Sequence, residues 1–151
     1  MNKILKIVCV CLLFTIIEPF SAFADAGFAN DSSVEKTSNN YDWNNVINAI
    51  IQVESQGNSR AKSGNSVGAM QITPVLVLQC NQILKRRKSK KRYKLSDRFS
   101  IQKSKEMFLL IQAFYNPMNN VEQAIRSWNG GMHYSITRTQ RYFEKVMSYI
   151  K

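Results

Sequence analysis

The chain has 151 residues, enough for one ordinary domain and not for two. It carries a formal net charge of +11, from 21 Lys and Arg residues against 10 Asp and Glu residues. Of its three cysteines, Cys9 and Cys11 lie in an apolar N-terminal run. If that run is removed, one cysteine is left, which excludes an internal disulfide.

The first segment has the pattern of a secretory signal peptide. Two lysines precede an apolar run over residues 7–17, and Ser-Ala-Phe-Ala follows at residues 21–24. A membrane anchor is the alternative, but the run falls well short of the roughly 20 residues that a spanning helix needs. We therefore predict export to the periplasm or the medium, with a signal peptide over residues 1–24. Cleavage is expected after Ala24, with Ala26 as the second choice.

Residues 25–40 are small and polar, and we predict a flexible lead-in without a core of its own. The first helix is then expected to begin with Asp42 as its N-cap and to stop at Gly57. Counting from Trp43, the residues at offsets of three, four and seven are apolar, and the residue at offset eleven is Glu54. This spacing places the Glu54 carboxylate on the inward face of the helix, in its last turn.

The rest of the chain is also predicted to be helical. Residues 58–64 are expected to form a polar loop, and residues 66–72 a short turn or helix. Four further helices are predicted from apolar residues at helical spacing: Thr73-Pro74 through Leu84, about 99–115, Asn120 through Trp128, and about 137–150. The helix over about 99–115 is expected to bury four side chains, Ile101, Phe108, Ile111 and Phe114. No alternating strand pattern is present, so we predict a single all-α, or nearly all-α, domain over residues 41–151.

Cys80 is the cysteine that export would leave in the chain. It lies on the apolar face of a predicted helix, which favours a buried and inert thiol. A nucleophilic thiol is the alternative, with His133 as the single histidine available as its base. Neither residue belongs to a metal-ligand spacing, so we expect no metal and no cofactor.

Much of the positive charge lies between Lys85 and Arg98. Such a run would bind a polyanion through counterion release. For an exported protein, the expected partners of the segment Lys85–Lys94 are anionic wall polymers or a membrane surface, and no nucleic acid is expected. The sequence alone favours the simpler interpretation, a solvated loop without a specific partner.

Glu54 gives the first indication of chemistry. A carboxylate on the inward face of a helix is costly unless it is neutral, paired or functional. Desolvation raises the pKa of such a group, which suits a general acid that works near neutral pH. Spacing alone does not favour catalysis, because a position at the edge of the apolar face or a partner in the core explains the residue more simply.

Four motifs around Glu54 occur in the order of a known family. They are Val-Glu-Ser-Gln-Gly-Asn at 53–58, Val-Gly-Ala-Met-Gln-Ile-Thr-Pro at 67–74, Ser-Trp-Asn-Gly-Gly at 127–131 and Thr-Gln-Arg-Tyr-Phe-Glu-Lys-Val at 139–146. Together with Ser63 they resemble the soluble lytic transglycosylase (SLT) domain, which is related in fold to goose-type lysozyme. The resemblance covers roughly residues 41–151. It implies a lysozyme-like domain that acts on peptidoglycan glycan strands, and we expect a monomer.

The resemblance implies that Glu54 is the catalytic residue. Its carboxyl group would protonate the bridging oxygen between N-acetylmuramic acid and N-acetylglucosamine. The resulting carboxylate would then take the proton of the muramic C6 hydroxyl as this attacks the anomeric carbon. The product is a 1,6-anhydromuramic end, no water is consumed, and one carboxylate suffices where many glycosidases use two. Glu122 and Glu144 are unsupported candidates for a second carboxylate.

Six further positions match the family's substrate-binding part: Ser63, Met70, Gln71, Trp128, Asn129 and Tyr142. The amides of Gln71 and Asn129 offer both a donor and an acceptor to N-acetyl groups or hydroxyls. Tyr142 is expected to hydrogen-bond Glu54 or the glycan. For Met70 and Trp128, packing in the core is the competing role.

The sequence departs from the family pattern at three places. Ala69 replaces the usual Leu and Trp128 replaces the usual Tyr, and the loop from Ser63 to Gly68 is one residue shorter than is common. The Trp128 substitution removes a hydroxyl that often lies beside the acid. Gly68 itself is expected to let the backbone pass close to the catalytic helix.

Three other functions stay open at this point. A hydrolytic muramidase of the lysozyme type would use water in place of the C6 hydroxyl. A peptidoglycan-binding module would bind the same glycan without cleaving it. A cationic protein that binds polyanions through Lys85–Lys94 would act independently of Glu54.

Overall fold

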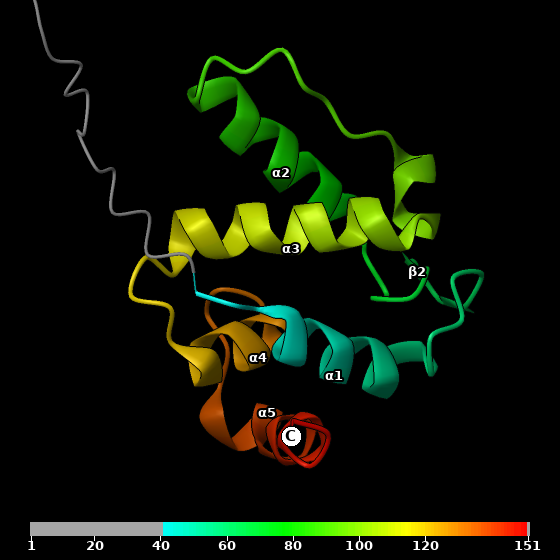
Figure 1. Ribbon diagram of the computed structural model, residues 1–151, viewed down its shortest axis with the longest axis vertical. Coiled ribbons are helices and arrows are strands. Elements are labelled where there is room, and N and C mark those ends of the chain that lie inside the picture. The colour runs from blue at the N-terminus through cyan, green and yellow to red at the C-terminus, as the bar shows by residue number, and fades with distance from the viewer. Residues whose placement is uncertain (1–40, 151) are drawn as a thin grey trace, which may run out of the picture. The chain divides into compact units, whose positions relative to one another are not determined.

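The computed structural model describes residues 41–150 (Figure 1). The predicted signal peptide over residues 1–24 and the lead-in over residues 25–40 lie outside the described residues and stay predictions. Five α-helices make up most of the described chain: α1 (Asn44–Ser55), α2 (Pro74–Arg86), α3 (Ile101–Tyr115), α4 (Val121–Gly130) and α5 (Ile136–Met147). The hairpin of β1 (Lys62–Ser63) and β2 (Ser66–Val67) and the 3-10 helix η1 (Leu95–Phe99) join them. The prediction of a nearly all-α, lysozyme-like domain is confirmed.

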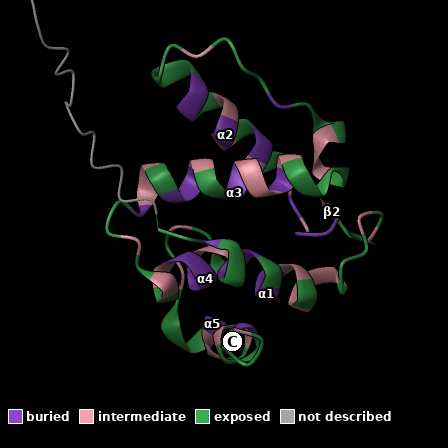
Figure 2. Ribbon diagram, viewed as in Figure 1, coloured by how far each residue is buried: buried purple, intermediate pink, exposed green. Residues whose placement is uncertain are grey.

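Helix α3 runs through the middle of the domain (Figure 1). Helix α2 packs on one side of it, α1 and α4 lie on the other, and α5 packs against α1 and α4. Phe108 of α3 is fully buried and contacts Trp43 and Trp128, with ring centroids 5.6 and 5.2 Å apart. The buried faces of the helices turn toward this centre and form one continuous core (Figure 2). Among residues 41–150, no helix is both long enough and apolar enough to span a membrane.

Capping residues fix the starts of α2 and α4. The Thr73 hydroxyl accepts a hydrogen bond from the Leu76 amide, and Pro74 is the first residue of α2, where its missing N–H costs nothing. The Asn120 side chain accepts in the same way from the Gln123 amide at the start of α4. Both predicted helix starts are confirmed.

The start of α1 differs from the prediction. Trp43, not Asp42, is the N-cap, and the first helical residue is Asn44. The Asp42 carboxylate still accepts a 2.9 Å hydrogen bond from the Asn44 amide, so it supports the helix from one residue further out. The helix ends at Ser55, where Gln56 takes a left-handed conformation with φ 55°.

The helix predicted over about 99–115 is two elements, η1 and then α3. Phe108 and Ile111 are buried and Phe114 is half-buried against the core, as expected. The prediction is wrong for Ile101, which is exposed because it is the first residue of α3 and lies ahead of the turns that reach the core. Helix α4 also runs further than predicted, to Gly130.

A hairpin that was not predicted takes the end of the loop expected over residues 58–64 and the first two residues of the turn or helix expected over 66–72. Residues 68–71 form a turn, as expected. Each strand of the hairpin has two residues, too few for the alternation that predicts a strand from sequence. Gly68 follows β2 with φ 79°, and a Cβ atom there would overlap the Arg98 carbonyl oxygen. The close approach is therefore to the end of η1, and not to α1 as the sequence led us to expect. Arg98 reinforces this contact by donating to the carbonyl oxygens of Asn65 and Ile72.

Cys80 is fully buried in α2. Burial raises the pKa of its thiol to about 12, because a thiolate would lose its hydration there. The prediction of a buried thiol is confirmed, and a protonated, enclosed thiol is a poor nucleophile.

Candidate active site

Glu54 and Tyr142 meet at the contact between α1 and α5. Glu54 lies in the last turn of α1, and Tyr142 lies in the middle of α5. The Tyr142 hydroxyl donates a 2.7 Å hydrogen bond to Oε1 of Glu54. Of the two partners expected for Tyr142, the structure thus brings it to Glu54.

Burial is the strongest influence on the Glu54 carboxyl and raises its pKa above the ordinary value of 4.5. The hydrogen bond from Tyr142 and the positive charge of Lys145 favour the carboxylate and lower this pKa in part. The pKa of Tyr142 is raised by its own burial and by the nearby Glu54, so the phenol keeps its proton and remains a donor. The net result is a carboxyl group biased toward its acid form.

Glu54 faces a cleft of about 240 Å³. Its walls come from the hairpin, the turn before α2, the first turn of α2 and the end of α4: Glu54, Ser63, Ser66, Gln71, Thr73, Leu76, Trp128 and Asn129. Four of these were singled out from sequence as substrate-binding residues, namely Ser63, Gln71, Trp128 and Asn129. Among the lining residues, Glu54 is the only one with a carboxylate.

Gln71 is held in place by the turn that precedes α2. Its backbone is left-handed, with φ 49°, and its side-chain amide nitrogen donates a 2.9 Å hydrogen bond to the Gly68 carbonyl. That bond orients the amide and leaves its oxygen free to accept from a ligand. Asn129, at the end of α4, is exposed and lines the same cleft.

Trp128 and Met70 are joined by a hydrogen bond, but only Trp128 lines the cleft. The Trp128 indole N–H donates a 3.2 Å hydrogen bond to the Met70 carbonyl, and the half-buried indole lines the cleft. The Met70 side chain is fully buried and does not line the cleft. For Met70, burial favours the packing role over contact with a sugar. The Trp128 ring packs on Phe108 and also lines the cleft, so its substrate-binding role stays a prediction.

Ser55, which follows Glu54, faces the turn that carries Gln71. Its hydroxyl donates a 2.8 Å hydrogen bond to the Ala69 carbonyl. This bond ties the end of α1 to the turn, so the Glu-Ser pair positions the acid and the cleft wall relative to each other.

Arg126 joins α4 to α5 from a buried position. It is only 3% exposed, and its guanidinium donates to Glu122, to the Ile136 carbonyl, to Thr139 and to Gln140. Because Thr139 and Gln140 lie within one turn of Tyr142, this network fixes the part of α5 that presents Tyr142 to Glu54. Within residues 41–150, no other arginine is buried to this degree.

Sequence reasoning missed three residues of the cleft. Ser66 lies directly opposite Ser63 in the hairpin, a register that would have revealed it had the strands been predicted. Thr73 was noticed only as a helix cap. Leu76, one turn later, lines the cleft because of the direction in which α2 runs, which the sequence does not show. No signal in the sequence distinguishes Leu76 from the core residues of the same helix.

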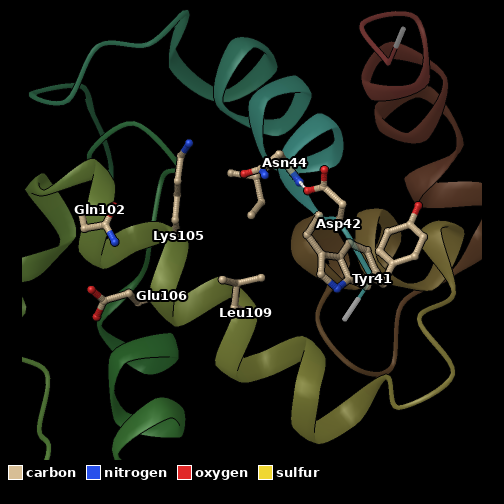
Figure 3. A pocket seen from close by; sticks show the side chains of 9 residues that line it. Tyr41, Asp42, Asn44, Gln102, Lys105, Glu106 and Leu109 are labelled. Atoms are coloured by element: carbon tan, nitrogen blue, oxygen red, sulfur yellow. Dashed lines mark hydrogen bonds between the residues drawn. The ribbon is translucent and has the colours of Figure 1, made fainter. Parts of the chain in front are cut away.

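A larger hollow, of about 570 Å³, lies at the other end of α1, against α3 (Figure 3). It contains two carboxylates, but both are engaged. Asp42 accepts from the Asn44 amide, and Glu106 pairs with Lys91 and Lys103, which lowers its pKa. The lowered pKa of Glu106 makes it a poor proton donor, whereas the carboxyl group with a raised pKa, Glu54, lies in the smaller cleft. Within residues 41–150, no three His, Cys, Asp or Glu side chains gather in a way that could hold a metal ion.

A comparison with protein families shows which family the chain belongs to. The model of the transglycosylase SLT domain matches residues 31–149. The chain belongs to the transglycosylase SLT domain family. No curated protein and no solved structure matches it. As an SLT domain, the chain has a peptidoglycan-acting, lytic transglycosylase-type function.

The two other acids considered from sequence do not share the SLT cleft. Glu122 is bound by Arg126, and Glu144 accepts a 2.7 Å hydrogen bond from the Gln140 amide. Neither lines the cleft. The SLT domain therefore presents one carboxyl group, Glu54, to a ligand in this cleft.

Proposed function

We propose that this protein is a peptidoglycan lytic transglycosylase. It cleaves the β-1,4 bond between N-acetylmuramic acid and N-acetylglucosamine and leaves 1,6-anhydromuramic ends. The observation that carries the proposal is the single carboxyl group in the cleft, Glu54, which is half-buried and held by Tyr142. A cleft with one carboxyl group lacks the second carboxylate on which most glycoside hydrolases depend.

In the first step, the protonated Glu54 gives its proton to the bridging oxygen, and the bond from that oxygen to the anomeric carbon of the muramic residue breaks. The C6 hydroxyl oxygen of the same residue then bonds to the anomeric carbon and closes the 1,6-anhydro ring. Its proton passes to the Glu54 carboxylate, which restores the acid. The Tyr142 hydrogen bond and the Lys145 charge stabilise the carboxylate that exists between the two transfers.

The remaining walls of the cleft suit an N-acetylated glycan. Ser63 and Ser66 on the hairpin and the amides of Gln71 and Asn129 offer donors and acceptors to hydroxyl and N-acetyl groups. Trp128 and Leu76 offer apolar surface to a sugar ring. The indole replaces the hydroxyl usual in the family, and its N–H is already engaged by Met70, so this position contacts the sugar without adding a proton donor.

Digestion of purified peptidoglycan, with the products analysed by mass spectrometry, tests the proposal. The wild type is expected to release 1,6-anhydro muropeptides, and Glu54→Gln, which cannot give up a proton, is expected to release none above background. Glu144→Gln is the matched control, since it removes an exposed carboxylate outside the cleft, and it should cleave like the wild type. Products heavier by one water, with reducing ends, would identify a hydrolase. Binding without cleavage by the wild type would identify a non-catalytic module.

We also propose that the protein works outside the cytoplasm. The substrate of its family is cell-wall peptidoglycan, and residues 1–24 have the pattern of a secretory signal peptide. N-terminal sequencing of the protein recovered from the host's envelope or medium is expected to start at Asp25. Recovery of the uncleaved chain from the cytoplasm alone would contradict this proposal.

A further inference from the structure

The segment Lys85–Lys94, which leads from the end of α2 toward η1, concentrates exposed positive charge within ten residues. It contains eight basic residues and no acidic residue, and all eight basic side chains are exposed. Within residues 41–150, only one of them is in an ion pair, Lys91 with Glu106 at 2.6 Å. The other seven positive charges are not neutralised by the fold.

Contacts of the segment show which of its side chains face the protein. Lys91 and Tyr93 both reach Glu106, through their Nζ and Oη atoms at 2.6 and 3.4 Å, and Tyr93 is buried. In a non-helical, extended stretch, side chains alternate between two sides, and every second residue is about 6.6 Å further along. By this alternation Lys90, Arg92 and Lys94, all exposed, lie on the other side of the stretch, and we call them the outward row. The Arg92 guanidinium also donates to the Ser89 and Lys91 carbonyl oxygens of the segment itself, at 2.7 and 2.6 Å.

The backbone that carries this outward row is pinned to α2. The Asn81 amide accepts a hydrogen bond from the Tyr93 N–H and donates one to the Tyr93 carbonyl, at 2.8 and 2.9 Å. The Ser89 amide donates to the Leu84 carbonyl at 2.9 Å. The cations are thus held near one another instead of spreading apart. Their mutual repulsion lowers the stability of the fold, and a bound polyanion would relieve it.

No residue of the outward row lines the cleft. Thr73 and Leu76, at the N-terminal end of α2, line the cleft, whereas the basic segment begins at its C-terminal end. The segment leaves α2 at its C-terminal end and returns to the middle of the helix, where Tyr93 is bonded to Asn81. Figure 1 shows the segment as an open arc that leaves this far end of α2. A ligand on the outward row would leave the cleft free.

We propose that the outward row, together with Lys85–Lys88, is a docking surface for a linear phosphodiester polymer of the cell envelope. Lysine and arginine side chains bind phosphate through charge and hydrogen bonds. A row of cations matches a linear chain of phosphates better than it matches the plane of a membrane surface. A membrane-binding segment usually adds apolar side chains that enter the lipid. Here the one aromatic or aliphatic side chain among residues 85–94 is Tyr93, which is buried.

Binding of fluorescent poly(glycerol phosphate) at several salt concentrations tests the docking surface. The test variant is Lys90→Gln/Arg92→Gln/Lys94→Gln. The control variant, Arg60→Gln/Arg138→Gln/Arg141→Gln, removes the same charge from exposed positions elsewhere. The test variant is expected to bind at least about tenfold more weakly. Its plot of log association constant against log salt should be less steep by about 2, while the control keeps the wild-type slope.

Two outcomes would overturn this proposal. Equal losses in the test and control variants would mean that net charge alone attracts the polymer. Binding to vesicles that contain phosphatidylglycerol, with none to the polymer, would mean that the surface serves a membrane. The proposal is independent of Glu54, and both triple variants are expected to digest peptidoglycan stripped of anionic polymers at the wild-type rate.

Discussion

The state of one proton links the residues of the cleft. In the proposed mechanism Glu54 holds that proton before cleavage and releases it during cleavage, and its surroundings suit both steps. Burial favours the acid, while the Tyr142 hydroxyl and the Lys145 charge favour the carboxylate. Neither influence alone would suit a group that acts as an acid and then as a base.

Tyr142→Phe removes one of these influences. Without the hydrogen bond to Oε1, the pKa of Glu54 is expected to rise further, because burial is then opposed only by Lys145. The alkaline limb of the activity profile, on which Glu54 loses its proton, should move to higher pH, and the maximal rate should fall about tenfold or more. Turnover of peptidoglycan across a pH series measures both. An alkaline limb that stays in place would show that Tyr142 does not tune Glu54.

Glu54 also makes the stability of the protein depend on pH. Its pKa is above 4.5 in the folded state and near 4.5 in the unfolded chain, so between these values the folded state binds more protons. Stability must then fall as pH rises through this window. Glu54→Gln has no such proton, and we expect its melting temperature to exceed that of the wild type at neutral pH. The difference should vanish below pH 4.5, and a constant difference at all pH values would contradict the linkage.

The contact between α4 and α5 positions the site at the level of helices. Helix α5 brings Tyr142 to Glu54, and its orientation depends on the buried Arg126 network of α4. The Arg126 guanidinium also stacks over the Phe143 ring, with 4.3 Å from its central carbon to the ring centroid. We therefore infer that Arg126 is a positioning residue, which would act on Glu54 only through the helix that it holds.

Arg126→Met tests this positioning role. The variant leaves the Thr139 and Gln140 side chains without their buried donor, and we expect a loss of stability on the order of 2–4 kcal/mol. At a temperature where the variant is still folded, its alkaline limb should move in the same direction as that of Tyr142→Phe. Arg138→Met, an exposed change on α5, serves as the control. A destabilised variant with an unchanged pH profile would limit Arg126 to a structural role.

How well sequence predicted the elements depended on how local their signals are. Apolar spacing and the caps at Thr73 and Asn120 were enough for the helices, because these signals lie within each helix. The hairpin was missed because its strands are too short to show a period. The partner of Gly68 was also mistaken. The contact with Arg98 joins residues 30 positions apart and depends on tertiary packing.

At the scale of the whole molecule, the cleft depends on an element that adds nothing to its walls. The motifs that indicated the family lie before α3 and after it, and α3 contributes no residue to the cleft. Its Phe108 packs against Trp43 and Trp128 and so holds the two halves of the site together. Sequence motifs pointed to Glu54, Gln71 and Asn129, and all three line the cleft. The motifs did not show whether the Met70 side chain lies in the cleft or in the core, because its position is determined only when the helices pack.

Helix α2 joins the cleft to the start of the basic segment and fixes the distance between them. Its first turn belongs to the cleft, and its last turn begins the basic segment. If the basic end holds a wall polymer, release of a cut glycan strand does not return the enzyme to free solution. The next strand is then met at an effective concentration set by the tether and not by the amount of enzyme secreted. A few molecules retained in this way would cut repeatedly within one small area of wall, so α2 would determine where the wall is opened as well as how the cleft is built.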